Sequence, residues 1–458
     1  MASSHSMDLT KGSVFKQLII FAIPVLLSNL LQQLYNAADV IVVGRFAANG
    51  ETALAAVGST GAITLLLLNL FNGLAIGANI VCSNLFGARK RAALSDAMHT
   101  SVLLAVVSGV SISIIGVIFA RPLLQLMSCR EEIIDQATLY MQIFFCGAPF
   151  SLLYNFGAGI LRAFGDTRRP MYILATTGLV NVGLNLFFVV VLHLDVAGVA
   201  LATIVAQFLS AVMVLLLLFS PRGEYKMQLR KLRFHKQAIS KVIAMGIPCG
   251  MNGMVFNIAN VTIQSSINTF SPAVVAGNTV GSNVTDFIYL IMSAFYTANV
   301  SFAGQCYGAK QYKRIDRLLV TSIIISCVGS LAATGIATIF SEELFSLYNT
   351  EPAVIQAATS KLLILGWTYY LCGISEMAIG CMRGMGRSTM PTLLNAFCIC
   401  APRLLWVWFI FPLNPVPKLL YICFPVSWGI SAVVQVVYYL HCRKKLFFTE
   451  VHHAEIAK

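Results

Sequence analysis

Long apolar stretches separated by short polar segments make up most of the chain. A helix needs about 20 residues to cross the hydrocarbon core of a bilayer, and most of these stretches reach or exceed that length. The pattern therefore predicts an all-α integral membrane protein with twelve transmembrane helices. The predicted spans are roughly 14–43, 52–82, 93–120, 132–160, 171–192, 197–219, 239–268, 273–304, 316–340, 353–382, 391–411 and 418–440.

The second half of the chain repeats the first. GILRAFGDTRRP at 159–170 returns as GCMRGMGRSTMP at 380–391, and the Ile23-Pro24 pair returns as Ile247-Pro248. An even number of spans in each half makes both halves enter the membrane from the same side, so the repeat is parallel, with its axis along the membrane normal. Helix bending is predicted at Pro24 and Pro248, because proline removes a helical hydrogen bond.

These landmarks divide the chain into lobes and connecting segments. The expected parts are an expression scar at 1–7, a six-helix N-terminal lobe at 8–220, a basic linker at 221–238, a six-helix C-terminal lobe at 239–445 and a tail at 446–458. We expect the two lobes to form a V around a central cavity and to alternate between inward and outward openings, with a single chain sufficient for function.

Charge is scarce and unevenly placed. Hydrophobic residues are 58% of the 458 and charged residues 11%, against about 25% charged in soluble domains, which excludes a soluble enzyme. The net charge of +13 comes mostly from loops on the side of the N-terminus, the positive-inside pattern. We expect a multi-pass protein of the plasma (inner) membrane, with linker and both termini in the cytoplasm, and no nucleic-acid partner.

No cofactor is expected. The 12 cysteines are scattered, many of them within apolar spans, with no paired metal spacing, so small packing residues are the simplest interpretation. The glycine-rich GMG at 384–386 follows no strand and precedes no Gly-Lys-Ser/Thr, so it is not a nucleotide loop. Without an ATP-binding motif, an ion gradient is the remaining energy source.

Polar side chains inside the apolar spans point to a cation site. The first span carries Asn29, Gln32, Asn36 and Asp39 at helical spacing, a stripe predicted to face the lobe interior. Asn181, Asn185 and Thr203 add side-chain oxygens in spans five and six, and oxygen ligands suit a hard cation such as Na⁺. Asp39 could instead carry a proton. The alternative interpretation is that the amides only bridge helices by hydrogen bonds.

These features together resemble the MATE (multidrug and toxic compound extrusion) family of secondary transporters, of the MOP superfamily. The resemblance rests on Gly159, Arg162, Gly165 and Pro170 with their second copies, on the polar opening at 23–44, on GVALAT at 198–203 and on the 6+6 plan. It implies antiport of organic cations or amphipathic drugs against H⁺ or Na⁺ through the inter-lobe cavity. It also implies a cation site formed by Asp39, Gln32, Asn181, Asn185 and Thr203, with Asn185 where some relatives have a second carboxylate.

The C-terminal half is chemically different. Its first span has an amide stripe that includes Asn260 and Gln264 but no acid, since Ile263 stands where the first half has Asp39. Glu376 and Asp286 are the remaining membrane acids, and Arg403 is the predicted charge partner of Glu376. Aromatic rings attract organic cations, so the predicted substrate cavity is lined by Tyr35, Tyr154, Asn260, Gln264, Asp286, Tyr289, Glu376 and Arg403.

A second function shares the same architecture. A lipid-linked oligosaccharide or lipid flippase of the same superfamily would have two parallel lobes, but its cavity would need several Arg or Lys side chains to hold pyrophosphate. Arg403 is the basic residue that we place inside the membrane, and a single such residue favours drug export. The identity of the substrate and the choice between H⁺ and Na⁺ stay open at this point.

Overall fold

Helices form every regular element of the part of the chain that the structure describes. The computed structural model describes residues 7–46, 50–127, 129–220 and 226–456. The elements of the first half are α1 (Val14–Phe46), α2 (Gly50–Gly87), α3 (Arg91–Leu126), α4 (Glu131–Cys146), α5 (Ala148–Ala163), α6 (Arg168–Leu186), the π-helix Phe187–Val191, α7 (Asp195–Phe219) and the 3-10 helix Leu229–Lys231.

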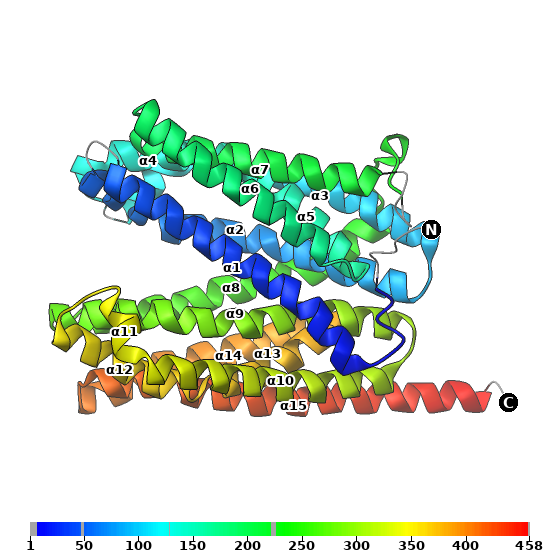
Figure 1. The fold of residues 1–458 in the computed structure, drawn as a ribbon. Coiled ribbons are helices and arrows are strands. Elements are labelled where there is room, and N and C mark those ends of the chain that lie inside the picture. Colours follow the sequence, from blue (N-terminus) through cyan, green and yellow to red (C-terminus); the bar gives the residue numbers. More distant parts are fainter. Residues whose placement is uncertain (1–6, 47–49, 128, 221–225, 457–458) are drawn as a thin grey trace. The chain divides into compact units, whose positions relative to one another are not determined.

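The second half continues in the same way (Figure 1). Its elements are α8 (Lys236–Ile267), α9 (Pro272–Gly308), α10 (Tyr312–Ile339), α11 (Ser341–Ser346), α12 (Pro352–Gly366), α13 (Tyr369–Gly384), α14 (Thr389–Leu405), the π-helix Trp406–Ile410, the 3-10 helix Phe411–Leu413 and α15 (Pro417–Ile456).

The helices have the length and apolarity of membrane spans. Among the described residues, ten helices are each long and apolar enough to cross a membrane. Two further spans are pairs of helices that meet at a bend: α4 with α5, at 44°, and α12 with α13, at 45°. Counting each pair as one gives twelve, as the apolar pattern predicts. The fold class is therefore confirmed as an all-α, multi-pass membrane protein.

The sharp bends occur at the fourth span of each half. The first bend follows Cys146, at Gly147, and the second lies at Trp367 and Thr368. By contrast, α1 runs through Pro24 and α8 through Pro248 as single helices. In α1 the Ser28 hydroxyl donates to the Pro24 carbonyl at 2.7 Å. Bending at the two prolines during transport stays a prediction.

The chain forms two compact units. Unit 1 comprises Met1–Gly253 and Gly304–Gln311, and unit 2 comprises Met254–Ala303 and Tyr312–Lys458. Helices α8 and α9 therefore contribute to both units. The division into lobes at 8–220 and 239–445 stays a prediction.

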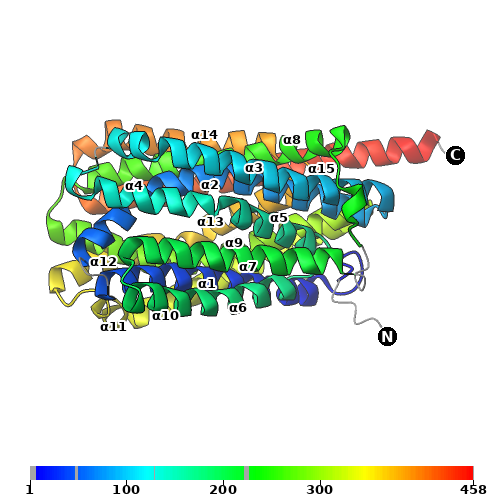
Figure 2. The ribbon, with the colours of Figure 1, turned by 90° about the horizontal axis from the view of Figure 1, so that it is seen from above.

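Unit 1 is built around α5. This helix packs against α2, α3 and α7, and α1 packs against α6, which in turn packs against α7. In both ribbon views α6 and α7 run alongside α1 (Figures 1 and 2). The core is apolar, with Phe156, Ala158 and Ile160 of α5 fully buried. The three helices α1, α6 and α7 therefore bring together the polar residues that the sequence singles out in the first half.

Unit 2 has a corresponding arrangement. Its central helix is α13, which packs against α10 and α15, and α14 also packs against α15. Leu362 of α12 and Leu420 of α15 are fully buried in its core. The polar positions of α8 and α9 lie beside this apolar core, where Ile263, Val284 and Ile288 are buried.

The internal repeat extends to local backbone geometry. Gly165 and Gly386, equivalent in the two copies of the motif, both have positive φ, at 81° and 77°, which a residue with a Cβ adopts only with strain. In addition, α6 and α14 each end in a π-helix, Phe187–Val191 and Trp406–Ile410. Single-turn π segments inside helices occur frequently at functional sites.

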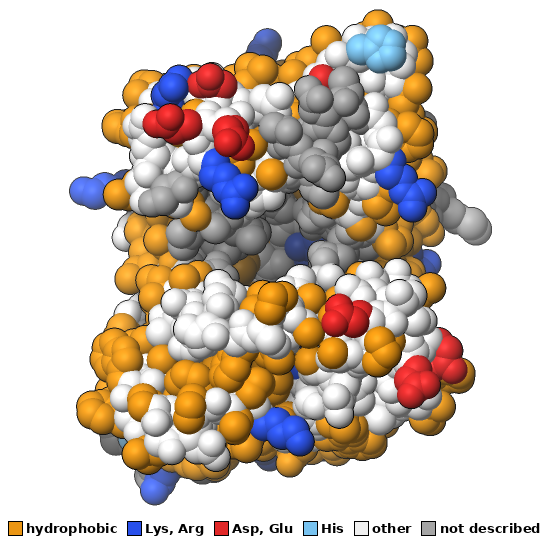
Figure 3. All heavy atoms as spheres, turned by 90° about the vertical axis from the view of Figure 1, so that its left-hand side faces the viewer, with side chains coloured by type: hydrophobic (Ala, Val, Ile, Leu, Met, Phe, Trp, Pro, Cys, Tyr) orange, Lys and Arg blue, Asp and Glu red, His pale blue; other side chains and the backbone are white. Residues whose placement is uncertain are grey.

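Opposite ends of the helices differ in charge. In unit 1 the exposed Arg89, Lys90 and Arg91 lie between α2 and α3, whereas Glu131 and Glu132 begin α4 at the other end. Figure 3 looks onto the end of unit 1 at which α4 starts, and acidic (red) and basic (blue) side chains are both visible on it. In unit 2, Glu342 and Glu343 lie in the first turn of α11.

Candidate functional site

Asp39 lies at a junction of three helices in unit 1. Its Oδ1 accepts a hydrogen bond from the Asn185 amide at 2.5 Å, and its Oδ2 accepts one from the Thr203 hydroxyl at 3.4 Å. Asn185 also donates to Asn181 Oδ1 at 3.3 Å. Four side chains from α1, α6 and α7 that the sequence predicts as a cation site are thus within hydrogen-bonding reach of one another.

This cluster is enclosed and holds an acceptor without a donor. Asn185 is fully buried and Asn181 is 4% exposed. The carbonyl oxygen of the Asn185 side chain has no hydrogen-bond partner among the described residues. A buried polar atom without a partner is destabilising by about 1–3 kcal/mol. An oxygen in this position beside a carboxylate is suited to a cation ligand.

The surroundings of the cluster are apolar. Val42 and Val43 of α1 pack with Val189, Val199 and Tyr140 in one buried cluster next to Asp39. A carboxylate in such an environment is costly unless hydrogen bonds or a cation compensate it. The two donors from Asn185 and Thr203 supply part of that compensation, and together the donor set carries a single negative charge.

Tyr35 fixes the position of Asp39 one turn away. Its hydroxyl donates to the Leu174 carbonyl of α6 at 2.7 Å. The ring lies directly against Gly178, where an added Cβ would stand 1.6 Å from a ring carbon. Because Gly178 lacks a Cβ, α1 and α6 approach closely enough for Asp39 to reach Asn185, two turns further along α6.

Gln32 and Asn36 lie elsewhere on α1. Both side chains are exposed, so the prediction that the whole polar stripe faces the interior is wrong for these two positions. Tyr35 and Asp39 define the packed face of α1, and Asn36 lies about 100° around the helix from Tyr35. Only part of the stripe therefore joins the Asp39 cluster.

Arg403 occupies the polar interior of unit 2. It is 1% exposed; its Nη1 donates to Asn260 Oδ1 at 2.9 Å and its Nε to Ser427 Oγ at 3.1 Å. No ion pair among the described residues joins it to Glu376, so that predicted partnership is wrong. The reason is its orientation: Arg403 faces α8 and α15, with its guanidinium 4.3 Å from the centre of the Phe424 ring.

Lys361 is a buried cation that the sequence interpretation missed. It lies within the predicted span 353–382 and inside α12, and it is 6% exposed. Its ammonium donates to the Asn278 carbonyl at 3.1 Å, to Asn278 Oδ1 at 2.9 Å and to the Ser282 hydroxyl. Asn278 in turn donates to Gln264 Oε1 at 2.9 Å. A basic residue inside the apolar run 353–382 was the signal that could have identified it.

The remaining predicted cavity residues belong to both units. Tyr154 is buried in unit 1, where its hydroxyl donates to the Pro170 carbonyl at 3.1 Å. In unit 2, Asp286 and Tyr289 are exposed on α9, and Glu376 is half-buried on α13. Their grouping around one substrate stays a prediction.

Comparisons with known proteins identify the family of the chain. The MatE family model matches residues 24–187 and matches again over 248–405, one match in each half. The probable multidrug resistance protein YoeA of Bacillus subtilis is 25% identical over 455 residues, 96% of this chain and 97% of that protein. The multidrug export protein MepA of Staphylococcus aureus is 20% identical over 84% of each chain.

Solved structures show the same fold. A MOP superfamily transporter from Pyrococcus furiosus superposes with a TM-score of 0.88 at 22% identity, over 96% of this chain and 98% of that one. Two matches to one family model, in both repeated halves of an all-helical membrane protein, establish the assignment. The chain belongs to the MATE family of multidrug efflux transporters.

Proposed function

We propose that this protein is a secondary active antiporter that exports organic cations or amphipathic drugs in exchange for H⁺ or Na⁺ bound at Asp39. The observation that carries the proposal is the enclosed cluster of Asp39, Asn181, Asn185 and Thr203, with a buried amide oxygen that lacks a partner. Carboxylate, amide and hydroxyl oxygens are the ligands of a hard monovalent cation.

Neutralisation of Asp39 is the proposed coupling step. A charged side chain inside the hydrocarbon core costs about 2.5–3.5 kcal/mol on insertion scales. A proton or a Na⁺ ion on Asp39 removes most of that penalty, and its release restores it. Asp39 lies on α1, while Asn185 and Thr203 lie on α6 and α7. A proton or Na⁺ ion bound at Asp39 would therefore change the strength of the interaction between α1 and these two helices. A ligand shifts a conformational equilibrium only through such differential binding.

We also propose that each chain has one exchangeable coupling site. In the second half Ile263, buried and apolar, stands at the position of Asp39. Arg403 falls between the positions that the repeat makes equivalent to Asn181 and Asn185, and it bonds Asn260, the counterpart of Asn36. A guanidinium that belongs to the chain cannot be released, so this half would hold a permanent positive charge where the first half exchanges one.

The orientation follows from charge. Basic residues gather in the loops between α2 and α3, before α8 and after α9, and the positive-inside rule assigns such loops to the cytoplasm. We therefore propose a plasma-membrane location with both termini cytoplasmic. A small-molecule substrate and the lipid bilayer are the proposed partners, and a monomer is sufficient.

Efflux from proteoliposomes tests the proposal. A fluorescent organic cation is loaded, and a pH gradient or a Na⁺ gradient is imposed alone. We expect one of the two gradients to drive export, and Asp39→Asn to lose that stimulation while it still inserts and folds. The matched control is Asp135→Asn, the same substitution at an exposed carboxylate paired with Arg121. Export by Asp39→Asn at the parent rate would reject Asp39 as the coupling site.

A further inference from the structure

Unit 1 has a cavity at the basic end of its helices, separate from the Asp39 cluster. Its volume is about 430 Å³, and it is lined by residues of α2, α3, the end of the linker and the first turns of α8. The described part of the linker (226–235) runs across α3 before α8 begins at Lys236. Nothing in the proposed export function uses this cavity.

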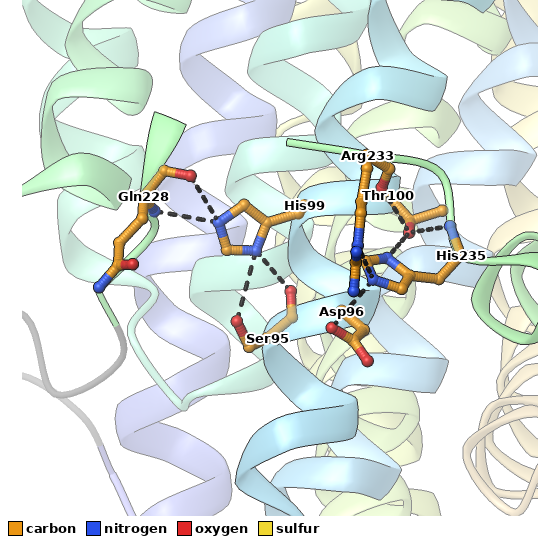
Figure 4. Close-up of polar contacts among 7 residues, drawn as sticks. All are labelled: Ser95, Asp96, His99, Thr100, Gln228, Arg233 and His235. Atoms are coloured by element: carbon orange, nitrogen blue, oxygen red, sulfur yellow. Dashed lines mark hydrogen bonds and ion pairs between the residues drawn. The ribbon is translucent and has the colours of Figure 1, made fainter. Parts of the chain in front are cut away.

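His99 holds the first part of the linker on α3. Its Nδ1 lies 2.7 Å from the Ser95 carbonyl, and its Nε2 accepts the backbone N–H of Gln228 at 3.0 Å when the ring proton is on Nδ1. Both contacts are drawn in Figure 4. His99 is itself 1% exposed, so this attachment is part of the packed structure rather than a surface contact.

His235 holds the second part of the linker and forms one wall of the cavity. Its backbone N–H donates to the Thr100 hydroxyl at 3.2 Å, and its Nε2 lies 3.2 Å from Asp96 Oδ1. Arg233 Nε lies 3.0 Å from the same ring nitrogen (Figure 4). The linker is thereby attached to α3 at Gln228 and at His235. These two attachments define where the side chains of Arg233 and Lys236 lie in the cavity lining.

Three basic side chains line one part of the cavity. Arg233, Lys236 and Lys241 contribute basic side chains, while Asp96, the acid of the lining, already contacts His235. In addition, α8 begins at this point. The first backbone N–H groups of a helix are not used inside the helix and carry the positive end of its dipole. An anion with several acceptor oxygens, such as a phosphate, fits these donors.

Apolar surface adjoins the positive groups. Val81 and Leu85 of α2 and Ala93 and Ala97 of α3 form part of the lining. Phe234 contributes as well and is 48% exposed. A ligand that combines a phosphate with a hydrocarbon portion matches both parts of the cavity, whereas a small inorganic ion would leave the apolar part without a partner.

We infer that this cavity binds the phosphate headgroup of an anionic phospholipid, with the start of the acyl chains against the apolar wall. The basic end of the helices is the one that the positive-inside rule assigns to the cytoplasm, and the cytoplasmic leaflet is the anionic one. Basic pockets at that level between transmembrane helices bind lipid headgroups. Occupancy would join the linker, α3 and α8 through one ligand.

Lipid binding to the purified full-length protein tests the inference. Native mass spectrometry would measure retention of dioleoylphosphatidylglycerol against dioleoylphosphatidylcholine, which has the same phosphate but no net charge. We expect preferential retention of phosphatidylglycerol. The double variant Lys236→Gln/Lys241→Gln should weaken it by about an order of magnitude, because each basic residue near an anionic surface contributes to binding.

The linker supplies a matched control. Arg230→Gln/Lys231→Gln removes the same charge from an exposed 3-10 turn outside the cavity lining and should leave retention close to the parent value. Equal loss in both double variants, or equal retention of the two lipids by the parent, would overturn the site. Inorganic phosphate that displaces phosphatidylglycerol at low millimolar concentration would overturn the lipid as ligand in favour of a free phosphate.

Discussion

At the scale of single residues, the Asp39 cluster depends on two hydrogen-bond donors from different helices. The Asn185 contact with Asp39 is short and Asn185 is fully buried. The Thr203 contact is longer, at 3.4 Å, and the single proton of its hydroxyl is shared with the Val199 carbonyl at 3.0 Å. The two contacts therefore contribute unequally. The weaker donor is the more informative one to remove, because its loss should leave the fold intact.

Thr203→Val removes the hydroxyl while it keeps the shape of the side chain. Hydrogen bonds to charged groups contribute about 1.5–3 kcal/mol, and the long distance favours the lower end. We expect about a tenfold loss of apparent affinity for the coupling ion, with the maximal rate of export little changed. Ion titration of export in proteoliposomes measures this. Thr176→Val, at an exposed threonine of α6 bonded to Tyr172, is the control, and an equal effect there would contradict the assignment.

The sequence is sufficient to bring Asp39, Asn181, Asn185 and Thr203 to attention, since oxygen-bearing side chains in apolar spans are rare. It does not predict contacts that depend on how helices rotate against one another. Arg403 faces Asn260 rather than Glu376, and Asn36 turns outward. Lys361 escaped notice because a long basic side chain near a span end usually reaches out to the interface, whereas here it turns inward to Asn278.

At the scale of helices, the close packing of α1 against α6 depends on one contact, between Tyr35 and Gly178. The Tyr35 ring occupies the space that a side chain at position 178 would need. Apolar periodicity predicts both helices but not this contact, because a lone glycine in an apolar run is ambiguous in sequence. The same holds for the bend in span ten, where no proline stands at Trp367 or Thr368, whereas in span four Pro149 is the second residue after the Gly147 break.

Gly178→Ala should displace Tyr35 and separate Asp39 from Asn185. Overpacking of this kind destabilises by about 1–3 kcal/mol, and we expect lower thermal stability together with a loss of ion-stimulated export. Gly183→Ala, on the same helix, adds a methyl group where nothing lies within 4 Å and should match the parent. Melting by intrinsic fluorescence and the efflux assay are the two readouts. Normal coupling in Gly178→Ala would show that this contact does not position Asp39.

At the scale of the whole molecule, two related halves carry different chemistry. The repeat is clear in sequence, in the doubled family match and in the paired glycine and π-helix geometry. Asp39, the acid proposed to exchange the coupling ion, lies in the first half, and the second half holds the buried Lys361 and Arg403. A duplicated fold has thus kept its architecture while its interior charges diverged.

The placement of basic residues predicts that the C-terminus lies in the cytoplasm. A fluorescent protein fused after the C-terminus should fluoresce, since it folds only in the cytoplasm, and alkaline phosphatase fused at the same point should be inactive. The reversed pair of results would place the linker and its cavity outside the cell. That outcome would also remove the anionic leaflet from the argument for the lipid site.

The central claim is that export is coupled to a cation at Asp39, and ion movement tests it most directly. Proteoliposomes without an ion gradient receive an outward gradient of the organic cation, and H⁺ or Na⁺ uptake is recorded with an ion-sensitive dye. The account predicts ion uptake in the parent and in Asp135→Asn, and none in Asp39→Asn. Undiminished ion uptake in Asp39→Asn would contradict it, because the coupling ion would then bind at another residue.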